Sequence, residues 1–121
     1  MTQQSIKFWQ SVCLSKKGAI EDTPFGPDAL VFKVSGKMFA LLTQRKDGLS
    51  LNLKCDPQEA LIIRDSFNAV TAGYHMNKKH WNTVNLEQDL DEQLIKGWID
   101  DSYLLVLNTL AKKARIQYLE D

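Results

Sequence analysis

The chain has 121 residues, and its 15 basic residues balance its 15 acidic residues. Hydrophobic residues make up 44% and charged residues 25%, which predicts a single globular domain. The zero net charge argues against a protein that binds nucleic acid through its overall charge. No apolar run approaches the roughly 20 residues of a membrane span. The polar N-terminal residues do not resemble a signal peptide, so we expect a cytoplasmic monomer.

The charges are distributed unevenly along the chain. Residues 30–54 carry five basic residues against one acid, and residues 72–83 carry two basic residues and no acid. Residues 84–121 carry eight acids against four basic residues. Because lysine and arginine supply phosphate contacts, the two basic segments are candidates for an anion-binding surface.

The first predicted element is a helix over residues 3–17, where apolar residues recur at helical spacing. Gly18 suits the position that follows a helix end. Cys13 lies on the apolar stripe, which favours a core residue over a nucleophile. Two prolines in residues 23–28 predict a stiff loop, and we expect Phe25 to anchor this loop against the core.

Two strands are predicted next, over residues 30–34 and 37–42. The two-residue connection Ser35-Gly36 predicts a tight hairpin with positive φ at the turn. Regular pairing around this turn places Leu41 on the core face and Leu42 on the opposite face.

A third strand over residues 49–54 follows a polar turn, and its residues alternate strictly. Three leucines point one way, and Ser50, Asn52 and Lys54 point the other way. A meander of these three strands has a second, partly polar face that bears Lys33 and Lys54. Such a face is either simply solvated or a binding surface.

A helix is predicted from Pro57 to about Phe67, with Asp56 as its N-cap. Cys55 precedes this helix, where nearby acids oppose a thiolate. Residues 68–72 are predicted to be a connection, and residues 81–86 a fourth strand.

The C-terminal third is predicted to be helical. Residues 89–92 have capping-box spacing, and Gly97 with the Asp100-Asp101 pair predicts a kink or a second helix start. The tail from residue 118 to 121 is expected to fray. The predicted class is therefore α+β: an antiparallel sheet, made of a meander plus a fourth strand, with helices packed on one face.

The catalytic and metal-binding motifs that we considered are not formed. Ser35-Gly36-Lys37 has the ending of a phosphate loop, but Val31 stands where glycine is required. His75 and His80 are five residues apart, so on a strand they point to opposite faces, and zinc needs further ligands. Histidine can act as a general base, but no partner is identifiable. We expect no enzyme activity, no cofactor and no metal.

Residues 73–84 combine basic and aromatic side chains without an acid. Lys78, Lys79 and His80 precede Trp81, a pattern that suits phosphate contacts beside a stacking ring. The alternative is a basic turn whose aromatic residues anchor it to the core.

Eight short motifs occur in order along the chain, at residues 18–19, 21–22, 24–28, 31–34, 36–41, 53–57, 73–84 and 102–103. In this order they resemble the MmcQ/YjbR family of small bacterial proteins. The resemblance implies a compact α+β domain of the CyaY-like, double-wing type, and it implies DNA binding. It carries no catalytic motif onto this chain.

The resemblance makes double-stranded DNA the expected partner. One wing would be the hairpin at residues 35–36 with the turn at 44–48, and the other would be residues 74–81. The predicted nucleic-acid-binding residues are Lys37, Arg45, Lys46, Lys54, Lys78, Lys79, His80 and Trp81. The alternative is that the open sheet face binds an unknown protein or a small ligand. Residues 110–113 replace a Leu-Pro-Lys-Lys-like ending, which predicts that the last helix continues through them.

Overall fold

The structure is a computed structural model that describes residues 3–46, 48–73 and 76–119. Tyr74 and His75, which belong to the predicted basic and aromatic stretch, lie outside the described residues.

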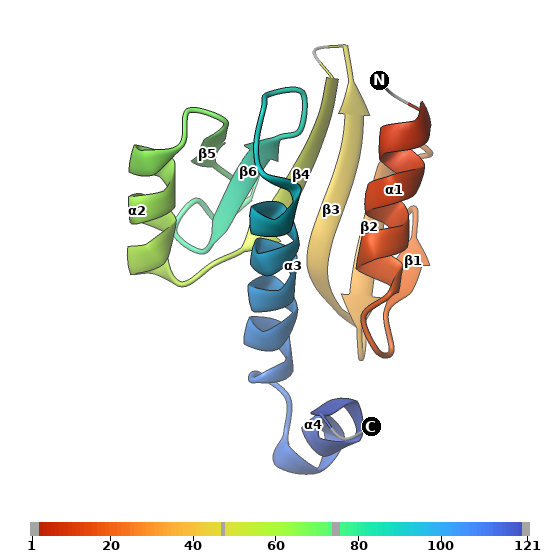
Figure 1. The fold of residues 1–121 in the computed structure, drawn as a ribbon. Coiled ribbons are helices and arrows are strands. Elements are labelled where there is room, and N and C mark those ends of the chain that lie inside the picture. Colours follow the sequence, from red (N-terminus) through yellow and green to blue (C-terminus); the bar gives the residue numbers. More distant parts are fainter. Residues whose placement is uncertain (1–2, 47, 74–75, 120–121) are drawn as a thin grey trace.

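An open six-stranded antiparallel sheet carries helices on one of its faces (Figure 1). The strands are β1 (Ile20–Asp22), β2 (Ala29–Val34), β3 (Lys37–Arg45), β4 (Gly48–Lys54), β5 (Val70–Ala72) and β6 (Trp81–Asn85). They lie in the order β1-β2-β3-β4-β6-β5. The helices are α1 (Gln3–Leu14), α2 (Pro57–Ser66), α3 (Glu92–Leu107) and α4 (Lys112–Leu119). The predicted α+β class and the predicted meander are confirmed.

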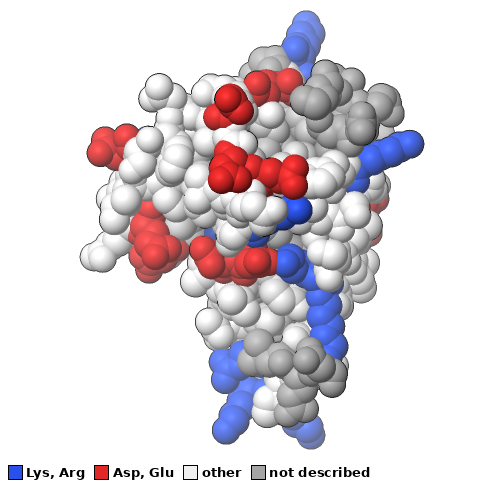
Figure 2. Space-filling model, viewed as in Figure 1, with Lys and Arg blue, Asp and Glu red and all other residues white. Residues whose placement is uncertain are grey.

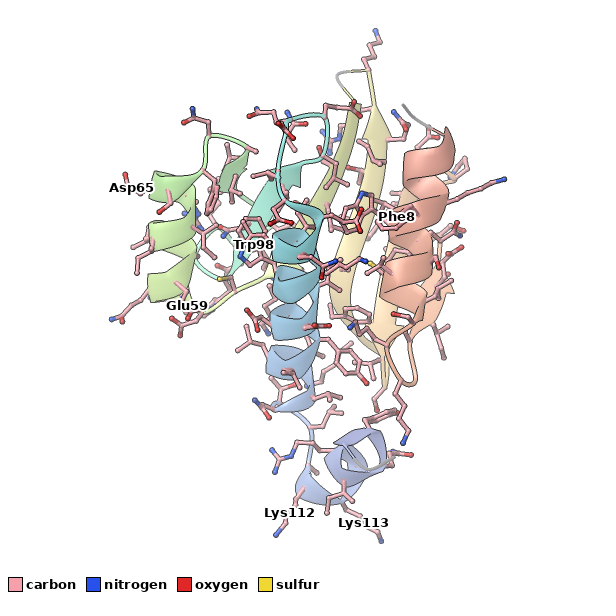
Figure 3. The ribbon with its side chains drawn as sticks, viewed as in Figure 1. Phe8, Glu59, Asp65, Trp98, Lys112 and Lys113 are labelled. Atoms are coloured by element: carbon pink, nitrogen blue, oxygen red, sulfur yellow. The ribbon has the colours of Figure 1, made fainter. Side chains whose placement is uncertain are left out.

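The core lies between the sheet and the helices α1, α2 and α3. Phe32, Leu51 and Ile99 are fully buried in it, and burial of each such side chain contributes about 1.5–3 kcal/mol. Trp98 of α3 packs edge to face on Phe67, with ring centroids 5.4 Å apart, and so joins α3 to the end of α2 (Figure 3). This packing leaves the opposite face of the sheet without a helix.

The turn between β2 and β3 has the predicted conformation. Ser35 and Gly36 have φ values of 51° and 80°, and the two strands pair antiparallel on either side of it. Positive φ at both central residues matches the twist of the strands, so this short turn fixes where pairing begins.

The pairing then shifts by one residue, because β3 contains a β-bulge. Phe32 pairs with Ala40 instead of Phe39, so Phe39 is the extra residue in β3. Beyond the bulge the two faces of β3 exchange roles: Leu42 lies in the core, and Leu41 pairs with a residue of the opposite face. The predicted faces of Leu41 and Leu42 are therefore wrong, since simple alternation cannot reveal an inserted residue.

Two edge strands were not predicted. β1 pairs with β2, and β5 pairs with β6; each has three residues, which is too short for a clear alternation. Residues 68–72 are thus not merely a connection. Phe25 does not anchor its loop, because 72% of its surface is exposed.

The helix boundaries follow local capping chemistry in part. The Asp56 side chain accepts hydrogen bonds from the N–H groups of Gln58 and Glu59, at 3.1 and 3.2 Å, as its predicted N-cap role requires. α3 begins after Asp91, whose side chain accepts from the Gln93 N–H. α3 then runs unbroken past Gly97, so the predicted kink is wrong.

The last helix does not continue α3. The Thr109 hydroxyl donates to the Val106 carbonyl at 2.7 Å, a local bond that competes with helix continuation, and the chain turns before α4. α4 lies beyond the end of α3 (Figure 1). Its Tyr118 is only partly exposed and packs against the core, so fraying is wrong for this residue.

Gly18 makes this packing possible. Its φ is 79°, and a Cβ atom at this position would lie 2.3 Å from Cε1 of the Tyr118 ring. α1 ends at Leu14 instead of residue 17, and a turn leads to Gly18. The longest described helix, α3, has 16 residues, and no helix of the described ranges is long and apolar enough to cross a membrane.

Candidate functional site

The sheet face turned away from α1, α2 and α3, called the open face below, is rich in hydroxyl and amide side chains. Ser50 and Asn52 of β4 alternate with the buried leucines of the core, as the sequence predicts. Thr83 and Asn85 are their direct partners on β6, and Thr43 is the partner of Ser50 on β3. A band of uncharged polar groups therefore crosses three adjacent strands.

This band forms a hollow of about 400 Å³. The hollow is closed on one side by β5 and by the segment that leads into it. Its hydroxyl and amide side chains include Thr43, Ser50, Asn52, Thr71, Thr83 and Asn85, and Arg45 is the charged member of its described lining. Thr71 could not be found from the sequence, because β5 was not recognised as a strand.

The hydrogen bonds in the hollow use the amide oxygens. The Thr83 hydroxyl donates to Asn52 Oδ1 at 2.5 Å, and the Glu87 N–H donates to Asn85 Oδ1 at 2.9 Å. Each asparagine can therefore offer its Nδ2 group as a donor. Asn52 is only 3% exposed, and both asparagines line the hollow.

Three of the predicted residues lie on the open face. Lys54 is the strand partner of Trp81. Lys54 is two residues from Asn52, and Trp81 is two residues from Thr83, so both lie on the same face of the sheet as these polar residues. Arg45 lies at the other end of the hollow, beside the turn that carries Lys46. The seven residues of β4 separate these two ends by about 20 Å.

Lys78 and Lys79 are exposed in the turn before β6, as predicted. Arg64 of α2 holds this turn: its Nη2 donates to the Lys78 carbonyl, and its Nε donates to Asn82 Oδ1 at 2.6 Å. The His80 carbonyl accepts from the backbone N–H of Cys55, two residues before α2, at 2.7 Å. The sequence gives no sign of this role of Arg64, because it depends on how α2 packs beside β6.

Lys37 lies apart from the other predicted residues. It opens β3, and Arg45 closes the same nine-residue strand, so their backbones are about 26 Å apart. Lys37 Nζ donates to the Thr109 hydroxyl at 3.1 Å, beside the connection to α4. The structure therefore does not bring the turns at residues 35–36 and 44–48 together.

Acidic residues gather on the helix side of the molecule (Figure 2). Nine of them lie in residues 56–66, in residues 86–92 and at positions 100–101 of α3; Glu59 and Asp65 point outward from α2 (Figure 3). On the open face, Asp22 is the acid that the described strands contribute, and it pairs with Lys33 at 3.5 Å. Lys16 and Lys96 pair with Asp100 and Glu92 on the helix side, so this side carries an excess of acids, which the zero net charge of the chain conceals.

The two cysteines are poor nucleophiles. Burial raises the pKa of the Cys13 thiol to about 12. Burial, together with the nearby carboxylates of Glu59 and Asp56, raises the pKa of Cys55 to about 11. Both thiols are protonated at neutral pH, and Cys13 is fully buried as predicted. Residues 3–46, 48–73 and 76–119 contain no group of three side chains suited to hold a metal ion.

Comparison with known proteins gives consistent matches. The YjbR family model matches residues 14–105. The chain is 42% identical over 90 residues to the uncharacterized protein YbdF of Escherichia coli O157:H7, and the match covers 74% of each chain. It is 30% identical over 103 residues to the uncharacterized protein YjbR of Escherichia coli (strain K12), which covers 85% of this chain and 87% of that protein.

Solved structures share the fold. The crystal structure of Deinococcus radiodurans protein DR2400 superposes with a TM-score of 0.86 and 34% identity, over 96% of this chain and 88% of that chain. A crystal structure of a protein from Pseudomonas syringae gives a TM-score of 0.72 and 29% identity, over 87% of this chain and 98% of that chain.

Proposed function

This chain belongs to the YjbR family, and we propose that it is a DNA-binding protein without enzymatic activity that acts as a monomer in the cytoplasm. The observation that carries the proposal is the separation of charge across the sheet. Most acids lie on the helix side, whereas the open face and its ends carry Arg45, Lys46, Lys54, Lys78 and Lys79. A polyanion is therefore attracted to the open face and repelled by the helix side.

The two ends of the open face act as the wings. Arg45 ends β3 and Lys46 lies in the turn that follows, and the turn before β6 carries Lys78 and Lys79. About 20 Å separates these ends along β4, which corresponds to about six nucleotide spacings of a DNA strand. Five basic side chains in this arrangement contact phosphates spread over one such segment.

All but one of the remaining predicted residues have supporting roles in this proposal. Trp81 and Lys54 are direct strand partners, so a base or sugar held by the ring lies next to a cation that binds its phosphate. His80 fixes the second wing through its carbonyl and adds a contact from its ring. Lys37, which pairs with the core residue Val34 and donates to Thr109, lies outside this surface. No step of covalent chemistry is required, and two protonated thiols agree with a purely binding role.

An amide-resolved NMR titration with a short DNA duplex at low salt tests the proposal. We expect shifts confined to residues 43–54 and 76–85 and their reversal by added salt. Five phosphate contacts give a log–log slope of affinity against salt of about −4 to −5. No shifts at high DNA concentration, shifts concentrated on α2 and α3, or an affinity independent of salt would overturn it. Sedimentation of the same sample tests whether the protein is a monomer in solution.

The hollow favours a second candidate, a module that binds a small ligand or a protein segment on the open face. Uncharged hydroxyl and amide groups line most of its described surface, and such groups orient small ligands in many binding sites. Binding of this kind depends little on salt, which separates it from phosphate contacts in the same titration.

A further inference from the structure

We propose that the hollow in the open face binds one nucleoside monophosphate unit, with its phosphate against Arg45 and its base and sugar against the amide and hydroxyl groups. The unit comes either from a free nucleotide or from an unpaired nucleotide of a nucleic acid. Many anions carry several hydrogen-bond acceptors. The inference rests on the proposed function only because DNA binding is the reason to choose a nucleotide among them.

The size of the hollow fits a single small molecule. Its volume of about 400 Å³ falls within the range of about 300–1,000 Å³ that is usual for small-molecule sites. The helices lie on the other side of the sheet, so nothing in the described part of the chain covers its opening. A paired base is stacked inside its duplex and cannot enter such a hollow, whereas an unpaired base can.

The chemistry of the lining selects a ligand rich in acceptors. Asn52 and Asn85 use their oxygens within the protein and keep their Nδ2 donors. An amide Nδ2 group only donates hydrogen bonds, so these two groups, in residues that line the hollow, suit acceptors of a ligand. Ring nitrogens and carbonyl oxygens of bases are such acceptors, and asparagine amides read base edges in this way.

Arg45 provides the positive charge that would bind the anionic phosphate of the ligand. Arg45 lines the hollow, and a guanidinium can donate two parallel hydrogen bonds to phosphate oxygens. Thr43 and Ser50, which face each other on β3 and β4, lie between Arg45 and the pair of Asn52 with Thr83. A ligand with a phosphate at one end and a base at the other therefore matches the order of the groups.

The first experiment is an NMR titration of the wild-type chain with the four nucleoside 5′-monophosphates, with inorganic phosphate and ribose 5-phosphate as comparison ligands. We expect saturable shifts at the amides of residues 50–52 and 83–85 with at least one nucleotide. Arg45→Ala should weaken this binding about tenfold and Thr83→Val about threefold. Arg115→Ala and Thr23→Val, which lie outside the hollow, should leave it unchanged. Equal shifts with inorganic phosphate alone would overturn the assignment.

The second experiment separates the two sources. A duplex with one unpaired nucleotide should bind more tightly than the perfect duplex, and Thr83→Val should remove this preference while it leaves perfect-duplex affinity unchanged. A preference of this kind assigns the site to nucleic acid, and free-nucleotide binding without the preference assigns it to a free nucleotide. Failure of both arms overturns the inference even if the perfect duplex binds. Nucleotide binding without any duplex binding overturns the proposed function and leaves the inference standing.

Discussion

The two faces of the sheet are built from the same strands but differ in what their side chains do. On β4, the leucines that face the helices are nearly or fully buried, while the residues between them carry hydroxyl and amide groups around a hollow. The helix side also carries most of the acids, and the open face is bordered by basic turns. Stability is thus concentrated on one face, which leaves the other free to bind.

The strongest test of this division uses two neighbours on β4. Leu51 is fully buried on the helix side, so Leu51→Ala should lower the free energy of unfolding by about 2–5 kcal/mol through lost burial and a cavity. Ser50 faces the open side, and Ser50→Ala should change it by less than about 0.5 kcal/mol. Urea denaturation of both variants measures the two effects. Equal losses would mean that the open face is also part of the stabilising core.

Ser102 provides a second test, because it joins α3 to the sheet where the bulge interrupts the pairing. The strand register would next pair Phe39 with Lys54. Instead, the Lys54 N–H donates to Ser102 Oγ at 2.8 Å, and the Ser102 hydroxyl donates to the Phe39 carbonyl at 2.6 Å. The fully buried hydroxyl thus completes the interrupted pairing.

Ser102→Ala should therefore lower the free energy of unfolding by about 2 kcal/mol, because two buried backbone groups lose their partner. Ser66→Ala is the matched control: its hydroxyl donates to a carbonyl of the exposed α2, and its removal should cost little. Urea denaturation measures both. A neutral Ser102→Ala would show that water replaces the hydroxyl and that the bulge does not depend on α3.

The residues at the bulge illustrate what the sequence could and could not predict. The turn at Ser35-Gly36, the N-cap Asp56 and the alternation of β4 are local signals, and all three are confirmed. The bulge at Phe39 is accompanied by a contact that is not local, because the Phe39 carbonyl accepts from Ser102, 63 positions later. Local patterns therefore predicted the α+β class but gave the wrong faces beyond the bulge.

The candidate site could also be predicted from the sequence only in part. Lys54 and Ser50 were predicted on a partly polar face because strict alternation fixes their side. The hollow was not predicted, since it needs β5 and its Thr71, which three residues of strand do not reveal. The wide separation of Lys37 from Arg45 follows from the length of β3, which the sequence underestimated by three residues.

The proposed DNA contacts should distinguish two of the three lysine pairs of the chain, Lys78-Lys79 and Lys112-Lys113. Replacing Lys78 and Lys79 together by alanine should weaken duplex binding about tenfold at low salt and reduce the magnitude of the salt slope by about 2, because two phosphate contacts are lost. Replacing Lys112 and Lys113, which project from α4 away from the sheet (Figure 3), should leave both quantities unchanged. Fluorescence anisotropy over a range of salt concentrations measures them. Equal losses from the two pairs would mean that DNA does not prefer the open face.

The smallest expected effect concerns Arg64, which links the two sides. It starts from α2 on the helix side and holds the turn of Lys78 through the Lys78 carbonyl and Asn82 Oδ1. Arg64→Lys keeps the charge but cannot make both bonds from one planar group. We expect shifted amides at residues 76–82 and duplex binding about threefold weaker, with an unchanged salt slope because no phosphate contact is lost. A slope smaller in magnitude by about 1 would identify Arg64 as a phosphate contact itself. In that case the DNA surface would extend around the edge of the sheet onto α2, where Glu59 and Asp65 oppose it, and the separation of the two faces would no longer explain binding.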